Sequence, residues 1–187
     1  MQTTITPEIK EKAVALYQKA SAHYSFETPL AVLHIAPDYT QLALGTKAEE
    51  PDAVWEFAVG TEKIAKEFFK HNPPTSGEVE NAIATVEDEI MPVSKLIPQN
   101  SRLMTFDEGI HEIEQQLPFP SSNISAMILF RDNLETVFTY LAAIVSGRPA
   151  SWHNIPTTPS FIANIIIVRE IMFHMDFNAI ANFFDCD

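Results

Sequence analysis

The sequence predicts an α/β domain in which a mixed sheet of about five strands is packed against helices. Short apolar runs with the character of strands occur between residues 30 and 59 and again near residues 101–106 and 179–184. Longer segments between them repeat apolar residues at the spacing of amphipathic helices. Of the 187 residues, 46% are hydrophobic and 20% are charged, which suffices for one globular core. We therefore expect a single domain over residues 1–187.

The N-terminal elements are a helix and three strands. Pro7 suits the first turn of a helix over residues 7–22, because the apolar residues that follow keep helical spacing. We expect residues 1–28 to form this N-terminal helical segment and residues 29–187 to form the main body. Strands are predicted at residues 30–35, 39–45 and 54–59. Three strands in succession indicate a meander.

Two helices should follow the meander. One begins at Gly60-Thr61 and ends before Asn72-Pro73-Pro74, since proline cannot continue the helical hydrogen bonds. Thr75 and Glu78 have the spacing of a capping box, which predicts that the next helix begins there. The outer face of this second helix carries Glu80, Glu87, Asp88 and Glu89. Such an acidic run is usually solvated, so we do not expect a cation site on it.

The C-terminal half should contain one more strand, three helices and a last short strand. The strand is predicted at residues 101–106 and a helix at residues 107–117, with two carboxylates in its positive first turn. Helical spacing returns at residues 124–145 and 160–176, and residues 179–184 suit a short strand. The second of these long helices is the most apolar of the chain and is expected to lie in the core.

Charge and composition exclude several classes of partner. The chain has 25 Asp and Glu against 12 Lys and Arg, a formal net charge of −13, and no basic cluster, so we expect no nucleic-acid partner. The longest apolar stretch, residues 161–168, falls short of the roughly 20 residues of a membrane span. The only cysteine, Cys186, has no partner for an intrachain disulfide, and no signal-like segment opens the sequence. A cytoplasmic protein that does not bind membranes is expected.

Four segments carry a resemblance to the exopolyphosphatase and guanosine pentaphosphate phosphohydrolase (Ppx/GppA) family. Residues 33–44, LHIAPDYTQLAL, resemble its segment VDIGGGSTELAL. Residues 57–74 are similar to its helix that ends in Pro-Pro, and residues 102–113, RLMTFDEGIHEI, to its segment LVGVGGTATTLA. Residues 147–180 resemble the stretch that closes the lobe. The resemblance covers residues 30–184 and implies one lobe of the actin-like ATPase, or ribonuclease H-like, fold.

The resemblance fails at the phosphate-binding positions. His34 stands where the family has an aspartate, Thr40 is kept, and Gly109 replaces a threonine. The residues in place of the family's glycines are Ala36, Pro37, Asp38, Asp107 and Glu108. Proline removes an N–H and three carboxylates repel an anion. The family's other lobe, which supplies the general base, precedes this one, whereas only about 30 residues precede the first strand here. A degenerate active site is expected, without hydrolysis of polyphosphate or guanosine pentaphosphate.

The leading hypothesis is therefore a non-catalytic lobe that works as a binding or assembly module without a cofactor. Its open face would be covered by a second copy, giving a homodimer, or by another protein. Aromatic residues are candidate anchors, although a place in the core is the more common one for each of them. They are Trp55, Phe119, Phe130, Phe138 and Trp152.

The alternative is a metal-dependent hydrolase or metal-binding protein with a rebuilt site. If the loops converge as the resemblance implies, His34, Asp38, Asp107 and His111 form a candidate site for a divalent metal. The wider candidate ligand-binding set is His34, Asp38, Thr40, Asp107, Glu108 and Gly109. Asp107 suits a helix cap equally well. A nucleotide site would rest on the resemblance alone, and Arg169 and His174 are expected to be structural.

Overall fold

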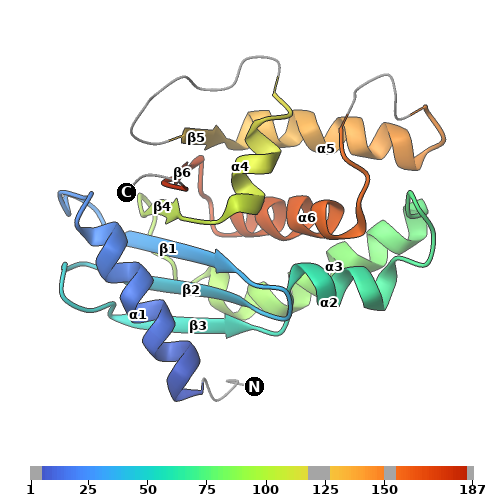
Figure 1. The fold of residues 1–187 in the computed structure, drawn as a ribbon. Helices are drawn as coiled ribbons and strands as arrows, with labels where there is room; N and C mark the ends of the chain where they lie inside the picture. Colours follow the sequence, from blue (N-terminus) through green and yellow to red (C-terminus); the bar gives the residue numbers. More distant parts are fainter. Residues whose placement is uncertain (1–5, 118–126, 150–154, 185–187) are drawn as a thin grey trace.

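The structure is a computed structural model that describes residues 6–117, 127–149 and 155–184. Six strands form one mixed sheet in the order β3-β2-β1-β4-β6-β5, with helices on both faces (Figure 1). The strands are β1 (Leu30–Ile35), β2 (Thr40–Gly45), β3 (Ala53–Phe57), β4 (Arg102–Thr105), β5 (Met127–Phe130) and β6 (Ala179–Asn182). The helices are α1 (Pro7–Ser21), α2 (Thr61–Phe68), α3 (Ser76–Ser94), α4 (Glu108–Glu114), α5 (Arg131–Val145) and α6 (Pro159–His174).

The predicted meander is confirmed, because β1, β2 and β3 pair antiparallel with their neighbours. β4 runs parallel to β1, and β6 runs parallel to β4. The carboxyl ends of β1, β4 and β6 consequently lie at the same edge of the sheet. This edge carries the β1–β2 turn and the start of α4, which the sequence singled out as the candidate site.

One prediction in the C-terminal half is wrong. Residues 124–145 were expected to be a single helix, but Met127–Phe130 form β5 and the helix begins only at Arg131. β5 pairs antiparallel with β6, with Met127 opposite Asn182 and Phe130 opposite Ala179. A short apolar run fits a strand or a helix turn equally well, so the pairing partner decides. Over the residues that the structure describes, the sheet therefore has six strands instead of about five.

Alternation along β1 divides the core between the two faces of the sheet. Leu30 and Val32 face α1 and pack around Tyr17, whereas Ala31 and Leu33 point to the larger core on the other face. The predicted N-terminal helix, α1, thus covers β1 and β2 on this face of the sheet. Burial raises the pKa of Tyr17 to about 12, with a smaller contribution from Asp52, and its hydroxyl donates to Lys47 O at 2.8 Å.

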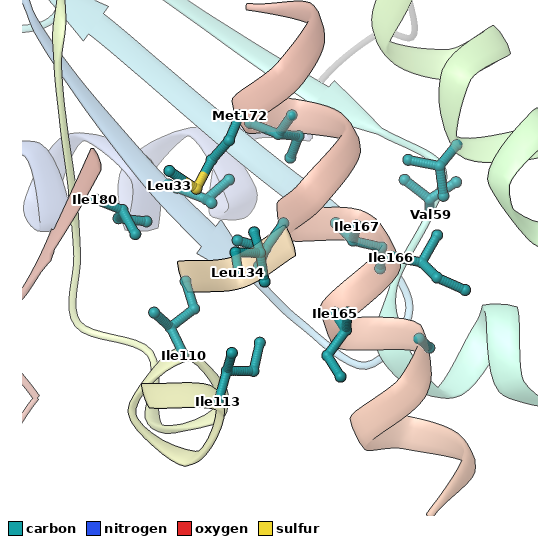
Figure 2. Close-up of a cluster of buried hydrophobic side chains, with 14 of the residues drawn as sticks. Leu33, Val59, Ile110, Ile113, Leu134, Ile165, Ile166, Ile167, Met172 and Ile180 are labelled. Carbon is teal, nitrogen blue, oxygen red and sulfur yellow. The ribbon is translucent and has the colours of Figure 1, made fainter. Parts of the chain in front are cut away.

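The most apolar helix, α6, lies at the centre of the larger core, as predicted. Eleven of its residues are buried, and α2, α3, α4 and α5 all contact it. Figure 2 shows Ile165, Ile166 and Ile167 of α6 among apolar side chains from several elements, Ile110 and Ile113 of α4 included. Within the described ranges, no helix combines the length and the apolar character that crossing a bilayer requires.

Candidate functional site

The turn between β1 and β2 is closed by its own backbone. Ala36 N donates to Tyr39 O at 2.8 Å, and Pro37 has no N–H to offer. The carbonyls of Ala36 and Pro37 point to the start of α2, where Glu62 N donates to Pro37 O at 2.9 Å and Thr61 N to Ala36 O at 3.2 Å. The N–H groups that a helix start would offer to an anion are therefore occupied by the turn.

Two of the candidate residues in this turn face opposite environments. Thr40 is fully buried, and its hydroxyl donates to Val59 O at 2.7 Å, which ties β2 to the segment before α2. Asp38 is exposed at the tip. The two side chains therefore do not form a common site, and Thr40 has a structural role.

The end of β1 is joined to the start of α4 by the side chains of His34 and Asp107. His34 Nδ1 donates to Asp107 Oδ1 at 2.6 Å, and Ile35 N donates to Asp107 Oδ2 at 2.7 Å. Asp107 is the N-cap residue of α4, as one reading of the sequence expected, but its side chain makes no capping bond. Both carboxylate oxygens bind β1 instead, so the carboxylate is used to connect the two loops.

The main chain of Asp107 is held as firmly as its side chain. Its N–H donates to Thr105 Oγ1 at 3.1 Å, and its carbonyl accepts from Asn182 Nδ2 at 3.1 Å. Strands β1, β4 and β6 therefore all contribute to its position. The carboxylate stands where the resemblance places a glycine that would leave space for phosphate.

The His34–Asp107 pair has one atom of chemical interest. The two side chains are 18% and 13% exposed, and no hydrogen-bond partner satisfies the buried His34 Nε2 within the described residues. Because Asp107 accepts from Nδ1, Nε2 of the neutral ring carries the lone pair. A carboxylate that orients a histidine ring in this way is also found beside histidines that act as general bases. Here, however, His34 Nε2 has little access to solvent.

The remaining candidates lie around α4 without completing a site. Glu108 is exposed, and a Cβ on Gly109 would approach Asn164 Nδ2 to 2.6 Å, so the glycine allows α6 to pack closely. His111 Nε2 accepts from Gln115 Nε2 at 2.7 Å on the same helix. The structure thus brings together His34 and Asp107 of the predicted metal set, while Asp38 and His111 join no group of three ligand atoms with them among the described residues.

A cluster that the sequence did not single out as a site lies between α3 and α6. His174 Nε2 is 3.1 Å from Glu87 Oε1 and 3.4 Å from Glu170 Oε2. Arg169 binds the other oxygen of Glu170, and its Nε lies 2.9 Å from Glu135 Oε1 on α5. Burial raises the pKa of Glu170, although the neighbouring guanidinium acts in the opposite direction.

Only part of this cluster had a signal in the sequence. Glu170 and His174 are four residues apart and therefore share one face of α6. Glu87 comes from a helix far away in the chain, and its face was expected to be solvated. Two of its four residues are half-buried and paired: the Glu87 side chain, still 41% exposed, lies 3.1 Å from His174, and Glu89 accepts from Ala58 N at 2.9 Å.

An apolar groove lies next to the cluster, between α3 and α5. It has a volume of about 240 Å³. The lining residues are Ser76, Val79, Glu80, Ile83, Phe138, Leu141, Ala142, Val145 and Ser146. Phe138 connects the groove to the cluster, because the Arg169 guanidinium lies over its ring at 4.3 Å.

Comparison with solved structures identifies the fold. A Ppx/GppA family member from Aquifex aeolicus superposes with a TM-score of 0.71 at 16% identity, covering 96% of this chain and 59% of the other. An exopolyphosphatase from Cytophaga hutchinsonii gives a TM-score of 0.66 at 10% identity, covering 94% and 59%. An exopolyphosphatase-like protein gives 0.67 at 13%, covering 93% and 62%.

These likenesses establish the fold, and the part of each structure that is matched is consistent with a single lobe. The chain spans about 60% of the length of the structures that it matches. The mixed sheet with packed helices is the actin-like ATPase arrangement, as the resemblance implied. No family profile matches the sequence, and no curated protein does.

Proposed function

We propose that this lobe of Ppx/GppA type is not a phosphohydrolase and acts by binding a protein surface, foremost that of a second copy. One observation carries the first half of the proposal. Asp107 occupies the space between the two loops and binds both His34 and Ile35 N. The groups that would hold a phosphate are thereby engaged with one another.

Electrostatics support the same conclusion. Asp38, Asp107 and Glu108 place three carboxylates on the two loops, in a chain of net charge −13. Two unit charges about 4 Å apart interact by about 1 kcal/mol in water and by several times more at partly buried sites. A polyphosphate chain would be repelled there.

Exposed apolar side chains support the second half of the proposal. Those on the described surface are Met91, Leu96, Phe130 and Phe173, between 43% and 59% exposed. Phe130 was among the predicted anchors. Trp55 and Phe138 instead pack against the core, and Phe119 and Trp152 lie outside the described residues. Exposed large apolar side chains favour self-association when the contact between two copies buries them together.

Two measurements test the proposal. Phosphate release from polyphosphate and from guanosine pentaphosphate, with Mg²⁺ or Mn²⁺ present, should not exceed the buffer rate, while an active exopolyphosphatase serves as the positive control. Light scattering should give the mass of a dimer, and Phe130→Asp or Phe173→Asp should reduce it to a monomer. Hydrolysis that disappears in Asp107→Asn would overturn the non-catalytic half, and a monomer at all concentrations would overturn the second-copy half.

A metal-dependent hydrolase with a rebuilt site remains the second candidate, favoured by one observation. His34 Nε2 lacks a partner among the described residues, and its ring is oriented by Asp107. Such an imidazole can ligate a metal or take a proton from water. Binding of Mn²⁺ or Zn²⁺ that His34→Ala abolishes, together with metal-dependent ester hydrolysis, would favour this candidate over the first.

A further inference from the structure

We propose that Glu87, Glu170 and His174 form a binding site for one divalent transition-metal ion of the zinc class, which links α3 to α6. The proposal concerns a different part of the molecule from the β1–β2 and α4 loops. It also stands independently of whether the lobe self-associates.

The distances fit a metal ion with small movements. The three ligand atoms lie within 4.8 Å of one another, and two of their separations are 3.1 and 3.4 Å. Zinc binds nitrogen and carboxylate oxygen at about 2.0–2.2 Å in a tetrahedral arrangement, which sets neighbouring ligands about 3.4 Å apart. One ion placed among the three atoms would therefore require side-chain adjustments only.

All three ligands are carried by helices whose positions are fixed by packing. Glu170 and His174 are separated by one turn of α6, the helix at the centre of the larger core. Glu87 comes from α3, which packs directly on α6. Ligands on rigid elements lose little conformational freedom on binding, so the site is preorganised.

Arg169 orients the buried ligand. Its Nη1 donates to Glu170 Oε1 at 2.5 Å, which leaves Oε2 directed to His174. The guanidinium is itself held by Glu135 and lies over the Phe138 ring. Such a partner on the second oxygen of a ligating carboxylate is a common feature of metal sites.

A divalent cation would satisfy the carboxylates of this cluster better than the hydrogen bonds alone do. In the ion pairs of the described residues, the Arg169 guanidinium lies against the carboxylates of Glu135 and Glu170, and Glu87 pairs with His174. The single hydrogen that His174 Nε2 can carry cannot be directed to both Glu87 and Glu170. A divalent ion bound to that nitrogen would contact both carboxylates at once.

The ligand types select the metal. A nitrogen ligand with two carboxylates suits zinc, and manganese less well, whereas magnesium and calcium prefer a shell of oxygen atoms. The Glu87 side chain is 41% exposed and that of His174 is 19% exposed, so the cluster is reached from solvent. A water molecule from that side would complete the four-coordinate shell.

Calorimetric titration of the metal-stripped full chain tests the proposal. Zn²⁺ should bind at one equivalent per chain, and Glu87→Gln and His174→Ala should each weaken binding at least about tenfold. Glu87 is partly exposed, so its substitution leaves the fold intact, which circular dichroism verifies. Co²⁺ in place of Zn²⁺ should give the visible absorption of a tetrahedral site, which a histidine bound only at the surface does not give.

His71→Ala is the matched control. His71 is 2.9 Å from a carboxylate oxygen of Glu78, but that pair is no part of a three-ligand group among the described residues. Its substitution should leave the affinity unchanged. The proposal is overturned if the wild-type chain shows no saturable binding, or if Glu87→Gln and His174→Ala bind Zn²⁺ as tightly as His71→Ala does.

Discussion

His34 Nδ1 lies 2.6 Å from Asp107 Oδ1, and this contact connects the carboxyl end of β1 to the first turn of α4. The same carboxylate accepts from Ile35 N at 2.7 Å. A residue that the sequence offers as a helix cap is thereby a link between two strand ends.

Asp107→Ala should destabilise the fold by about 2–4 kcal/mol, because it removes two charge-assisted hydrogen bonds and leaves Ile35 N without its acceptor. Urea unfolding followed by circular dichroism measures the change. Asp38→Ala, at the exposed tip of the turn, should stay within about 0.5 kcal/mol of the wild type. Equal effects of the two substitutions would show that the link contributes nothing.

Gly60→Ala should lower the free energy of unfolding by about 1–3 kcal/mol. A Cβ at this position would lie 2.5 Å from the backbone atoms Pro37 O and Tyr39 N. Gly77→Ala is the control, because a Cβ meets nothing within 4 Å there and the residue lies in α3. It should stabilise the protein by up to about 1 kcal/mol. Thermal unfolding of both variants checks the opposite signs.

Glu78 should make the stability depend on acid pH. The Thr75 N–H and, to a smaller extent, His71 and the Lys70 N–H lower the pKa of Glu78 from 4.5 to about 2. Because the ionised form is favoured in the folded state, its contribution is complete above the unfolded pKa of 4.5 and is lost as the pH falls toward 2.

The midpoint of thermal unfolding, followed from neutral pH downward, tests this dependence. At neutral pH the unfolding midpoint of the wild type should be higher than that of Glu78→Gln. The difference between the two midpoints should shrink as the pH falls through the window of 4.5 to 2. Glu67→Gln, which changes an exposed glutamate of α2, should show no such trend. A difference that is independent of pH would contradict the role of the Glu78 charge.

Ile166→Ala should destabilise the fold by about 2–5 kcal/mol, because Ile166 is fully buried in the helix that α2, α3, α4 and α5 contact. Leu96→Ala removes a similar side chain that is 59% exposed, and its effect should remain within about 0.5 kcal/mol. Chemical denaturation of the pair checks whether α6 is the centre of the core.

Most of the elements could be predicted because their signals are local. The capping box of Thr75 and Glu78 is present, and Thr75 N donates to Glu78 Oε2 at 2.7 Å. β5 could not be predicted, since a short apolar run becomes a strand only when β6 offers its edge. The sequence therefore predicted the fold class and missed one strand.

The candidate site was predictable in part. The resemblance brought His34 and Asp107 into one region, and the structure shows them in direct contact. It did not predict that Asp107 binds Ile35 N, because the direction of a side chain at a loop end depends on the neighbouring strand. Asp38 was expected in the same set, but its exposed position depends on how the turn closes against α2.

The sequence by itself determined the α/β class, the meander and the buried α6, because hydrophobic spacing, proline and glycine act over a few residues. Tertiary structure alone decided that Glu87 meets Glu170 and His174. It also decided that Asp107 links two loops instead of capping a helix. Such contacts join residues far apart in the chain, and only the packing of α3 on α6, and of β1 beside β4, brings their polar atoms within bonding distance.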